Sequence, residues 1–383
     1  MPNVLDIRRR IRSVVNTRQI TKAMKTVSAA KLRRAQEGAM AARPYSQMLA
    51  NVLKSLMSRA DTFDPDTGRP RHPLLAERPE NNILLLVVTG DKGLAGAFNT
   101  NILKLVSKFI QSKPNANIDI ESIGRKARDF MRRRYPLALR TTGDQKEQAV
   151  GVNNDARNDV QNDAPNEAQN EPNQAEERNR AERKGRVQIV GEHVGVLGKV
   201  EYRFPASIAN RIVDRYMHEE IDAVYILFNE FKSVIAQRLV AERILPVKEI
   251  GEVDIQMAEE ATEDEKTQRG EAAKTAGLSM RQADTSEIDE AASKFGTEAV
   301  DYIYEQPPEQ LFRDILPKYI TTQIFHALLE SVAAEHAARM TAMDSATSNA
   351  SDMIESLTLV MNRARQAKIT KEIIEIVSGA AAQ

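Results

Sequence analysis

The sequence contains no cysteine and no tryptophan, and only 10 Phe and 8 Tyr in 383 residues. The absence of cysteine excludes disulfides, thiolate metal sites and a cysteine nucleophile. With 42% apolar residues but so few aromatics, the composition favours long helices over a β-sandwich. The longest aliphatic run, residues 83–88, is too short to cross a bilayer, and residues 1–6 do not lead into a secretory signal. These absences predict a soluble protein of a reducing compartment, without direct membrane insertion.

The formal net charge is zero, because 54 Lys and Arg balance 54 Asp and Glu. The charges are not evenly spread along the chain. Residues 1–60 carry 13 basic and 2 acidic groups, whereas residues 144–184 and 252–296 are both acidic. The neutral total is therefore a cancellation between a basic head and two acidic segments.

The N-terminal segment 1–60 has the pattern of one long helix. Apolar residues alternate at spacings of three and four, as in the seam of a coiled coil, before and after a polar stretch at residues 18–28. A second apolar stripe, Ile20, Met24 and Val27, lies off this seam. We interpret the polar stretch as a surface that faces something besides the partner helix.

The C-terminal segment 309–383 has the same spacing, unbroken over residues 343–367, and Pro317 is expected to start or kink its helix. Small residues dominate 331–351, which would let two helix backbones approach closely. We therefore predict that the two terminal helices pair as a long antiparallel coiled coil. Two unrelated helices of a bundle are the alternative that spacing alone leaves open.

Residues 80–250 have a different pattern. The apolar run at residues 82–89 is typical of a strand buried on both faces, and further strands and helices alternate after it. This alternation predicts a Rossmann-like α/β domain with a largely parallel sheet. Within it, the Asn-rich insert 144–184 has too few apolar residues to fold and is expected to be disordered. The acidic insert 252–296 is Ala-rich and is expected to be partly helical.

A glycine-rich turn, Gly90 to Gly96, lies between a predicted strand and a predicted helix. Its position suits phosphate binding at a helix N-terminus, but its sequence matches neither the G-x-x-x-x-G-K-[ST] nor the G-x-G-x-x-G motif. We interpret it as a tight strand-to-helix turn. The five histidines show no metal-ligand spacing, so we expect neither a metal nor a cofactor.

The basic head is the most informative candidate site. Residues 7–34 contain ten Arg and Lys and no acid. Like charges on one helix are mutually destabilising, so this surface indicates an anionic partner. Nucleic acid is one candidate, although the segment lacks aromatics for base stacking, and an acidic protein surface is the other.

Four blocks of sequence resemble the gamma subunit of bacterial F-type ATP synthases. They are residues 12–36, the glycine turn 90–99, residues 335–349 and the segment 369–380, in this order. The resemblance implies a non-catalytic rotor of the central stalk, which couples proton flow to ATP synthesis or hydrolysis. It implies as partners the alpha and beta subunits, three of each, the epsilon subunit and the membrane c-ring. It also implies a peripheral protein at the cytoplasmic face of the bacterial inner membrane.

The resemblance further implies which residues face the alpha/beta ring. They fall on both terminal helices: Arg8, Arg9, Arg12, Met24, Lys25, Arg33, Arg34, Arg365, Gln366, Thr370, Glu372 and Glu375. The absence of cysteine excludes the thiol control that chloroplast members use. An independent nucleotide-binding α/β protein with helical arms, and a nucleic-acid-binding coiled coil, are the alternatives.

Overall fold

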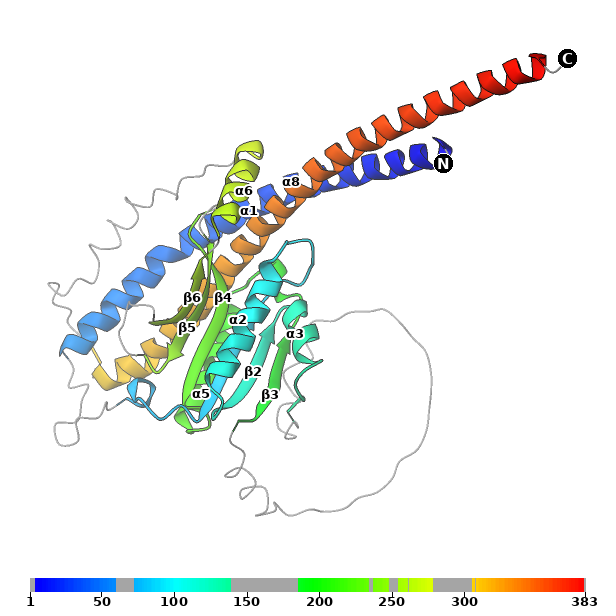
Figure 1. The fold of residues 1–383 in the computed structure, drawn as a ribbon. Helices are drawn as coiled ribbons and strands as arrows, with labels where there is room; N and C mark the ends of the chain where they lie inside the picture. Colours follow the sequence, from blue (N-terminus) through cyan, green and yellow to red (C-terminus); the bar gives the residue numbers. More distant parts are fainter. Residues whose placement is uncertain are drawn as a thin grey trace, which may run out of the picture.

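The computed structural model describes residues 4–59, 72–138, 185–233, 237–247, 254–260, 262–277, 305–306 and 308–381. Two long helices dominate it: α1 (Val4–Arg59) and α8 (Pro308–Ala381). At 1.5 Å per residue their lengths are about 84 and 110 Å. They run antiparallel and project together from one side of a small α/β domain (Figure 1). The predicted antiparallel coil is confirmed.

The part of the chain between the two helices forms one six-stranded sheet. Its strands are β1 (Asn82–Val88), β2 (Asn117–Ile123), β3 (Val187–His193), β4 (Ala223–Phe231), β5 (Gln237–Leu245) and β6 (Asp254–Glu260), in the order β3-β2-β1-β4-β5-β6. The first four strands of that order are parallel, and β5 and β6 add on antiparallel. The prediction of a largely parallel sheet is confirmed.

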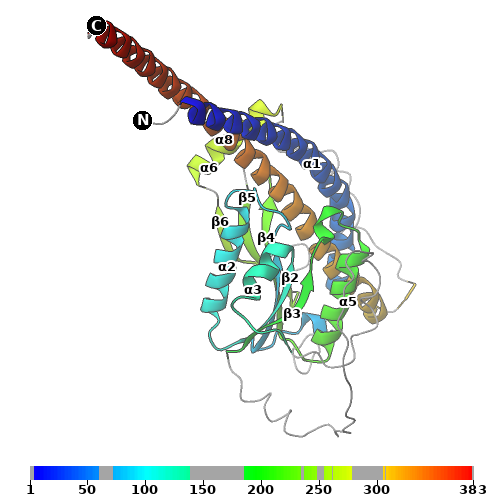
Figure 2. The ribbon, with the colours of Figure 1, turned by 90° about the vertical axis from the view of Figure 1, so that its right-hand side faces the viewer.

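Helices cover both faces of this sheet. One face packs against α2 (Phe98–Ser112) and α3 (Arg125–Met131), and the other against α5 (Arg203–Met217) and the lower half of the coil (Figure 2). Strand β1 is central and buried on both sides, which explains its continuous apolar sequence. Two short 3-10 turns, Pro73–Leu75 and Val196–Gly198, complete the connections.

The C-terminal helix begins earlier than its proline suggests. It begins at Pro308, so Pro317 does not start it, and the alternative expectation of a kink at Pro317 stays a prediction. Pro317 lies within the helix, and its carbonyl accepts a hydrogen bond from Thr321 Oγ1 at 2.7 Å.

The predictions for the two inserts have different outcomes. The Asn-rich insert 144–184, expected to be disordered, lies outside the described residues. The acidic insert contributes a strand as well as a helix: β6 pairs with β5, and α6 (Glu263–Thr275) follows it. In β6, Ile255 and Met257 pack on opposite faces of the sheet. The strand extends the sheet by one position beyond β5.

No described helix contains a stretch long and apolar enough to span a bilayer.

Candidate functional site

The candidate site is the outer surface of the coil beyond the α/β domain. Two contacts fix the register of the helices there: Thr347 Oγ1 donates to Thr21 Oγ1 at 2.8 Å, and Lys25 Nζ lies 2.5 Å from Asp344 Oδ1. Since the helices are antiparallel, Val4 at the start of α1 lies near Ala364. The remainder of α8 extends alone past the N-terminus (Figure 1).

The seam positions within the polar stretch of α1 face α8. Thr21 and Ser28 are buried against α8, and the ammonium of Lys25 is held by Asp344. The interpretation that residues 18–28 also face something besides the partner helix stays a prediction. The seam continues through them, with hydrogen bonds and one ion pair replacing apolar contacts.

This polar seam gives a stability prediction. Replacing Lys25 with Met leaves the carboxylate of Asp344, whose side chain is 25% exposed, without its cation. We expect the free energy of unfolding of the isolated chain to fall by about 1–3 kcal/mol. Denaturant titration measures this, and adding Asp344→Asn should restore most of the loss.

Lys22→Met is the matched control, because Lys22 is exposed one turn away on the same helix. It should change stability by less than about 0.5 kcal/mol. Equal losses in the two variants would contradict the assigned ion pair.

The second apolar stripe of α1 points outward. Ile20 and Val27 are 60% and 55% exposed, and Met24 lies half-buried between them. Exposed aliphatic side chains aligned on one helix face indicate a surface that another protein covers. Along residues 18–28, the polar seam positions thus pair with α8, and the stripe Ile20, Met24 and Val27 lies on the outer face of the same helix.

The predicted contact residues lie mostly on the free surface. On α1, Arg8, Arg9, Arg12, Arg33 and Arg34 are exposed, and on α8 Arg365, Gln366, Thr370 and Glu372 are exposed. Arg33 pairs with Glu37 and Lys368 pairs with Glu372, each one turn apart. Glu375 lies on α8, but its side chain is outside the described part. Lys25 differs from the other members, because its ammonium is engaged inside the coil.

Sequence reasoning missed an apolar stripe at the tip of α8. Its members are more than 45% exposed: Ile369, Ile373, Ile374, Ile376 and Val377. The sequence shows the spacing of Ile369, Ile373 and Ile376, at four and three residues, and the register of the coil places them beyond Val4, where α1 begins. The tip therefore carries apolar as well as charged residues.

The glycine turn is packed against the coil. A side chain at Gly90 would place its Cβ 2.7 Å from Glu335 Oε1, and Arg339 Nε donates to Gly93 O at 3.3 Å. The N–H of Gly90 is already bonded to Asn99 Oδ1 at 2.9 Å. The carboxylate of Asp91 accepts from the backbone of Arg125 and Gly195. Two carboxylates at the turn disfavour a phosphate there, and the turn instead fixes the domain to α8.

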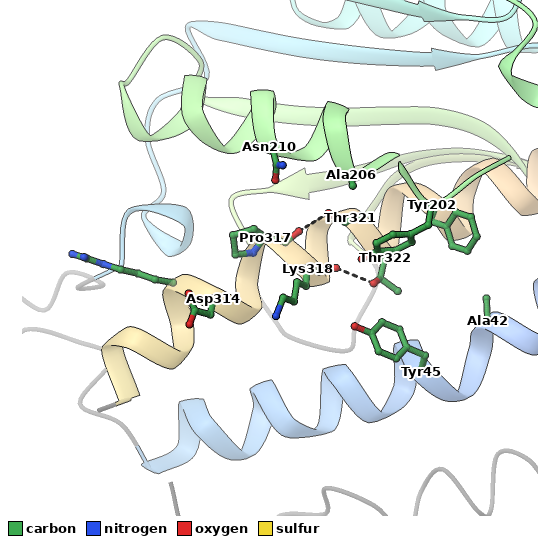
Figure 3. A pocket seen from close by; sticks show the side chains of 12 residues that line it. Ala42, Tyr45, Tyr202, Ala206, Asn210, Asp314, Pro317, Lys318, Thr321 and Thr322 are labelled. Carbon is green, nitrogen blue, oxygen red and sulfur yellow. Dashed lines mark hydrogen bonds between the residues drawn. The ribbon is translucent and has the colours of Figure 1, made fainter. Parts of the chain in front are cut away.

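A groove of about 750 Å³ opens where α1 separates from α5 and α8 (Figure 3). Tyr45 and Tyr202 lie on two of its sides. Thr321 and Thr322 donate their hydroxyls to carbonyls of their own helix, at 2.7 and 2.8 Å. The groove is also lined by the charged side chains of Arg313, Asp314 and Lys318. Among the described residues, no three His, Asp or Glu side chains gather as a metal site requires.

Comparisons with known proteins agree with this architecture. A family model described as ATP synthase matches residues 3–164 and 173–383. The ATP synthase gamma chain of Solibacter usitatus (strain Ellin6076) is 43% identical over 382 residues, covering 100% of this chain and 99% of that one. The gamma chain of Pelotomaculum thermopropionicum is 36% identical, with the same coverage.

Among solved structures, a chain of the Euglena gracilis mitochondrial ATP synthase aligns over 99% of this chain and 94% of that chain, with a TM-score of 0.48 and 15% identity. The sequence matches span both terminal helices and the α/β domain between them. The chain therefore belongs to the ATP synthase family, as one of its gamma chains.

Proposed function

We propose that this chain is the central-stalk rotor of an F-type ATP synthase and works by shape and torque. Its partners are the alpha and beta subunits, three of each, the epsilon subunit and the c-ring. Proton flow through the membrane ring turns the chain, and the turning coil drives ATP synthesis. In the reverse direction, ATP hydrolysis turns the coil and pumps protons. The chain itself supplies no catalytic group.

The single observation that carries this proposal is the free tip of the coil. From about Ala364 onward α8 is a lone helix with exposed charged and aliphatic residues, whereas α1 and α8 are paired below it. A shaft with one helix on its axis and another ending beside it has no threefold symmetry. Three equivalent sites around such a shaft contact three different surfaces, which lets them hold nucleotide with different affinities.

The outward residues of the coil are the proposed contacts with the ring. They comprise the exposed arginines of α1, the stripe Ile20, Met24 and Val27, and the exposed positions from Arg365 to Glu372, with Glu375 included from the sequence. Lys25 would reach the ring only where its ion pair with Asp344 opens. Exposed ion pairs contribute about 0–1 kcal/mol, so such contacts can be made and broken in every turn.

The α/β domain is proposed to join the coil to the epsilon subunit and the c-ring. The glycine turn and Glu335 fix the domain to α8, so torque applied to the domain passes directly into the coil. In this assembly the chain is peripheral to the membrane, at the cytoplasmic face of the inner membrane of a bacterium.

Affinity purification of the tagged chain tests the assignment. The rotor role predicts that alpha and beta subunits copurify in threefold excess over the chain, with ATPase activity in the purified complex. An independent nucleotide-binding protein would instead be purified without other subunits and would bind ATP by itself. Recovery of the chain without alpha and beta subunits would contradict the proposal.

A further inference from the structure

The groove between α1, α5 and α8 is lined by aromatic side chains that the described part of the chain leaves partly uncovered (Figure 3). Tyr45 of α1 and Tyr202, just before α5, are 49% and 44% exposed. The ring of Phe325 on α8 meets Tyr202 edge-on, with ring centroids 5.6 Å apart. Exposed aromatic rings gathered around a hollow of about 750 Å³ indicate a surface that another segment covers.

A segment of the chain itself has to pass this groove. Residues 278–304, outside the described part, connect the end of α6 to the region where α8 begins. Thr275 of α6 donates to Asp344 Oδ2 at 3.2 Å, whereas α8 begins at Pro308. At 1.5 Å per residue, these two levels of α8 are about 54 Å apart. The groove lies between them, because α8 lines it with residues 313–325.

The end of the connecting segment is long enough to cover the groove. An extended chain spans about 3.3 Å per residue, so residues 295–304 reach about 33 Å. The distance along α8 from Pro308 to Phe325 is about 26 Å. Residues 295–304 laid antiparallel to the first turns of α8 therefore extend over the whole groove. Because this segment is covalently joined to α8, its docking is intramolecular and needs few contacts.

The chemistry of the segment complements that of the groove. Residues 295–306 carry three acids and no base. They also contain five large apolar or aromatic side chains: Phe295, Val300, Tyr302, Ile303 and Tyr304. The charged residues that line the groove are two bases and one acid: Arg313, Lys318 and Asp314. The groove thus offers aromatic surface and an excess of positive charge to a segment that is apolar and acidic.

We propose that residues 295–304 dock into this groove in the folded chain. Their apolar side chains cover Tyr45 and Tyr202, and their carboxylates lie near Lys318. Since Tyr45 belongs to α1 and Tyr202 precedes α5, the docked segment joins the base of the coil to the α/β domain at a second place, besides the glycine turn. Docking needs no other subunit, so it does not depend on the proposed rotor role.

A single tryptophan in the full chain reports on the docking. Because the sequence has no tryptophan, Ile303→Trp introduces one fluorophore into the apolar part of the segment. Ala291→Trp is the matched reporter, in the same connection but upstream of the apolar part. We expect acrylamide to quench the fluorescence of Ile303→Trp several-fold more slowly than that of Ala291→Trp. Tyr304→Trp, at an aromatic position, is a second reporter and should be protected in the same way.

Changes in the groove should remove this protection. Tyr45→Asp replaces an aromatic wall with a charge, and Lys318→Glu places a carboxylate opposite the acids of the segment. Each change, added to Ile303→Trp, should raise its quenching to the level of Ala291→Trp. Tyr45 is half-exposed, so its replacement leaves the core intact, and circular dichroism checks that each variant is folded.

Two exposed positions outside the groove serve as controls for these changes. Leu359→Asp on α8 and Lys104→Glu on α2 should leave the protection of Ile303→Trp unchanged. Equal quenching of the upstream reporter and both apolar-part reporters, or protection that neither groove variant removes, would overturn the proposal. Protection that increases with the concentration of the chain would overturn it as well, because a second copy would then supply the covering segment.

Discussion

Replacing Met24 with lysine should reduce ATP-driven proton pumping by the assembled complex several-fold, with little change in the stability of the chain. Met24 lies between the exposed Ile20 and Val27 on the outer face of α1. A lysine there adds three donors to a surface that is proposed to slide past the ring. A hydrogen bond to a carboxylate of the ring is worth about 1.5–3 kcal/mol, and it would have to be broken in every turn.

The measurement compares proton pumping with ATP hydrolysis in membrane vesicles. Met48→Lys is the matched control: Met48 is also partly exposed on α1, but it lies beside the α/β domain, outside the proposed contact surface. We expect the ratio of pumping to hydrolysis to fall for Met24→Lys and to stay unchanged for Met48→Lys. An unchanged ratio for Met24→Lys would remove the stripe from the proposed contacts.

Replacing Glu242 with glutamine should stabilise the chain at pH 8 by about 3 kcal/mol. Glu242 is 7% exposed in β5, between Ile226 of β4 and Ile255 of β6. Burial, with smaller contributions from Glu230 and Asp254, raises the pKa of its carboxyl to about 7. The folded state therefore binds a proton more tightly than the unfolded state does.

The sign of the pH dependence follows from this shift. Below about pH 4.5, the carboxyl is neutral in both states and costs nothing. As the pH rises towards 7 the unfolded state ionises first, so stability falls, and above 7 the penalty is complete and constant.

Denaturant titrations of Glu242→Gln and the wild type should therefore agree near pH 4.5 and differ most at pH 8. Glu355→Gln, on the exposed face of α8, is the matched control and should show no such divergence. A stability difference between Glu242→Gln and the wild type that is the same at both pH values would refute the buried, uncompensated carboxylate.

The parts of the fold that the sequence predicts best are those with strong periodicity. The three-four spacing of both termini predicts the coil, because burial of one helix face repeats apolar residues at that spacing. The apolar run at residues 82–89 predicts the central strand, because a strand buried on both faces is apolar throughout.

Other features leave no periodic signal in the sequence. Strand β6 has only two large apolar residues among acids, so it reads as part of an acidic insert until β5 is seen to pair with it. Helix α6 docks through Ala272 and Ala273, small residues that are equally common on exposed helices. The contact of Lys25 with Asp344, 319 residues away, also depends on the register of the two helices and leaves no local pattern in the sequence.

The candidate site was predicted in part. The basic face of α1 and the tip of α8 were named from the sequence, and the structure leaves most of those side chains exposed. The aliphatic stripe of the tip was not named, because its residues look like the continuation of a seam. Only the register of the coil shows that they lie beyond Val4, where α1 begins.

Rotation of the chain itself is the most direct test of the central claim. Because the sequence has no cysteine, Lys126→Cys on the exposed surface of α3 gives the chain a single thiol for a visible probe. With the ring of alpha and beta subunits fixed to a surface, the account predicts stepwise rotation of the probe in one direction when ATP is added, with three stopping positions per turn. ATP hydrolysis by the same complexes with a stationary probe would contradict the account.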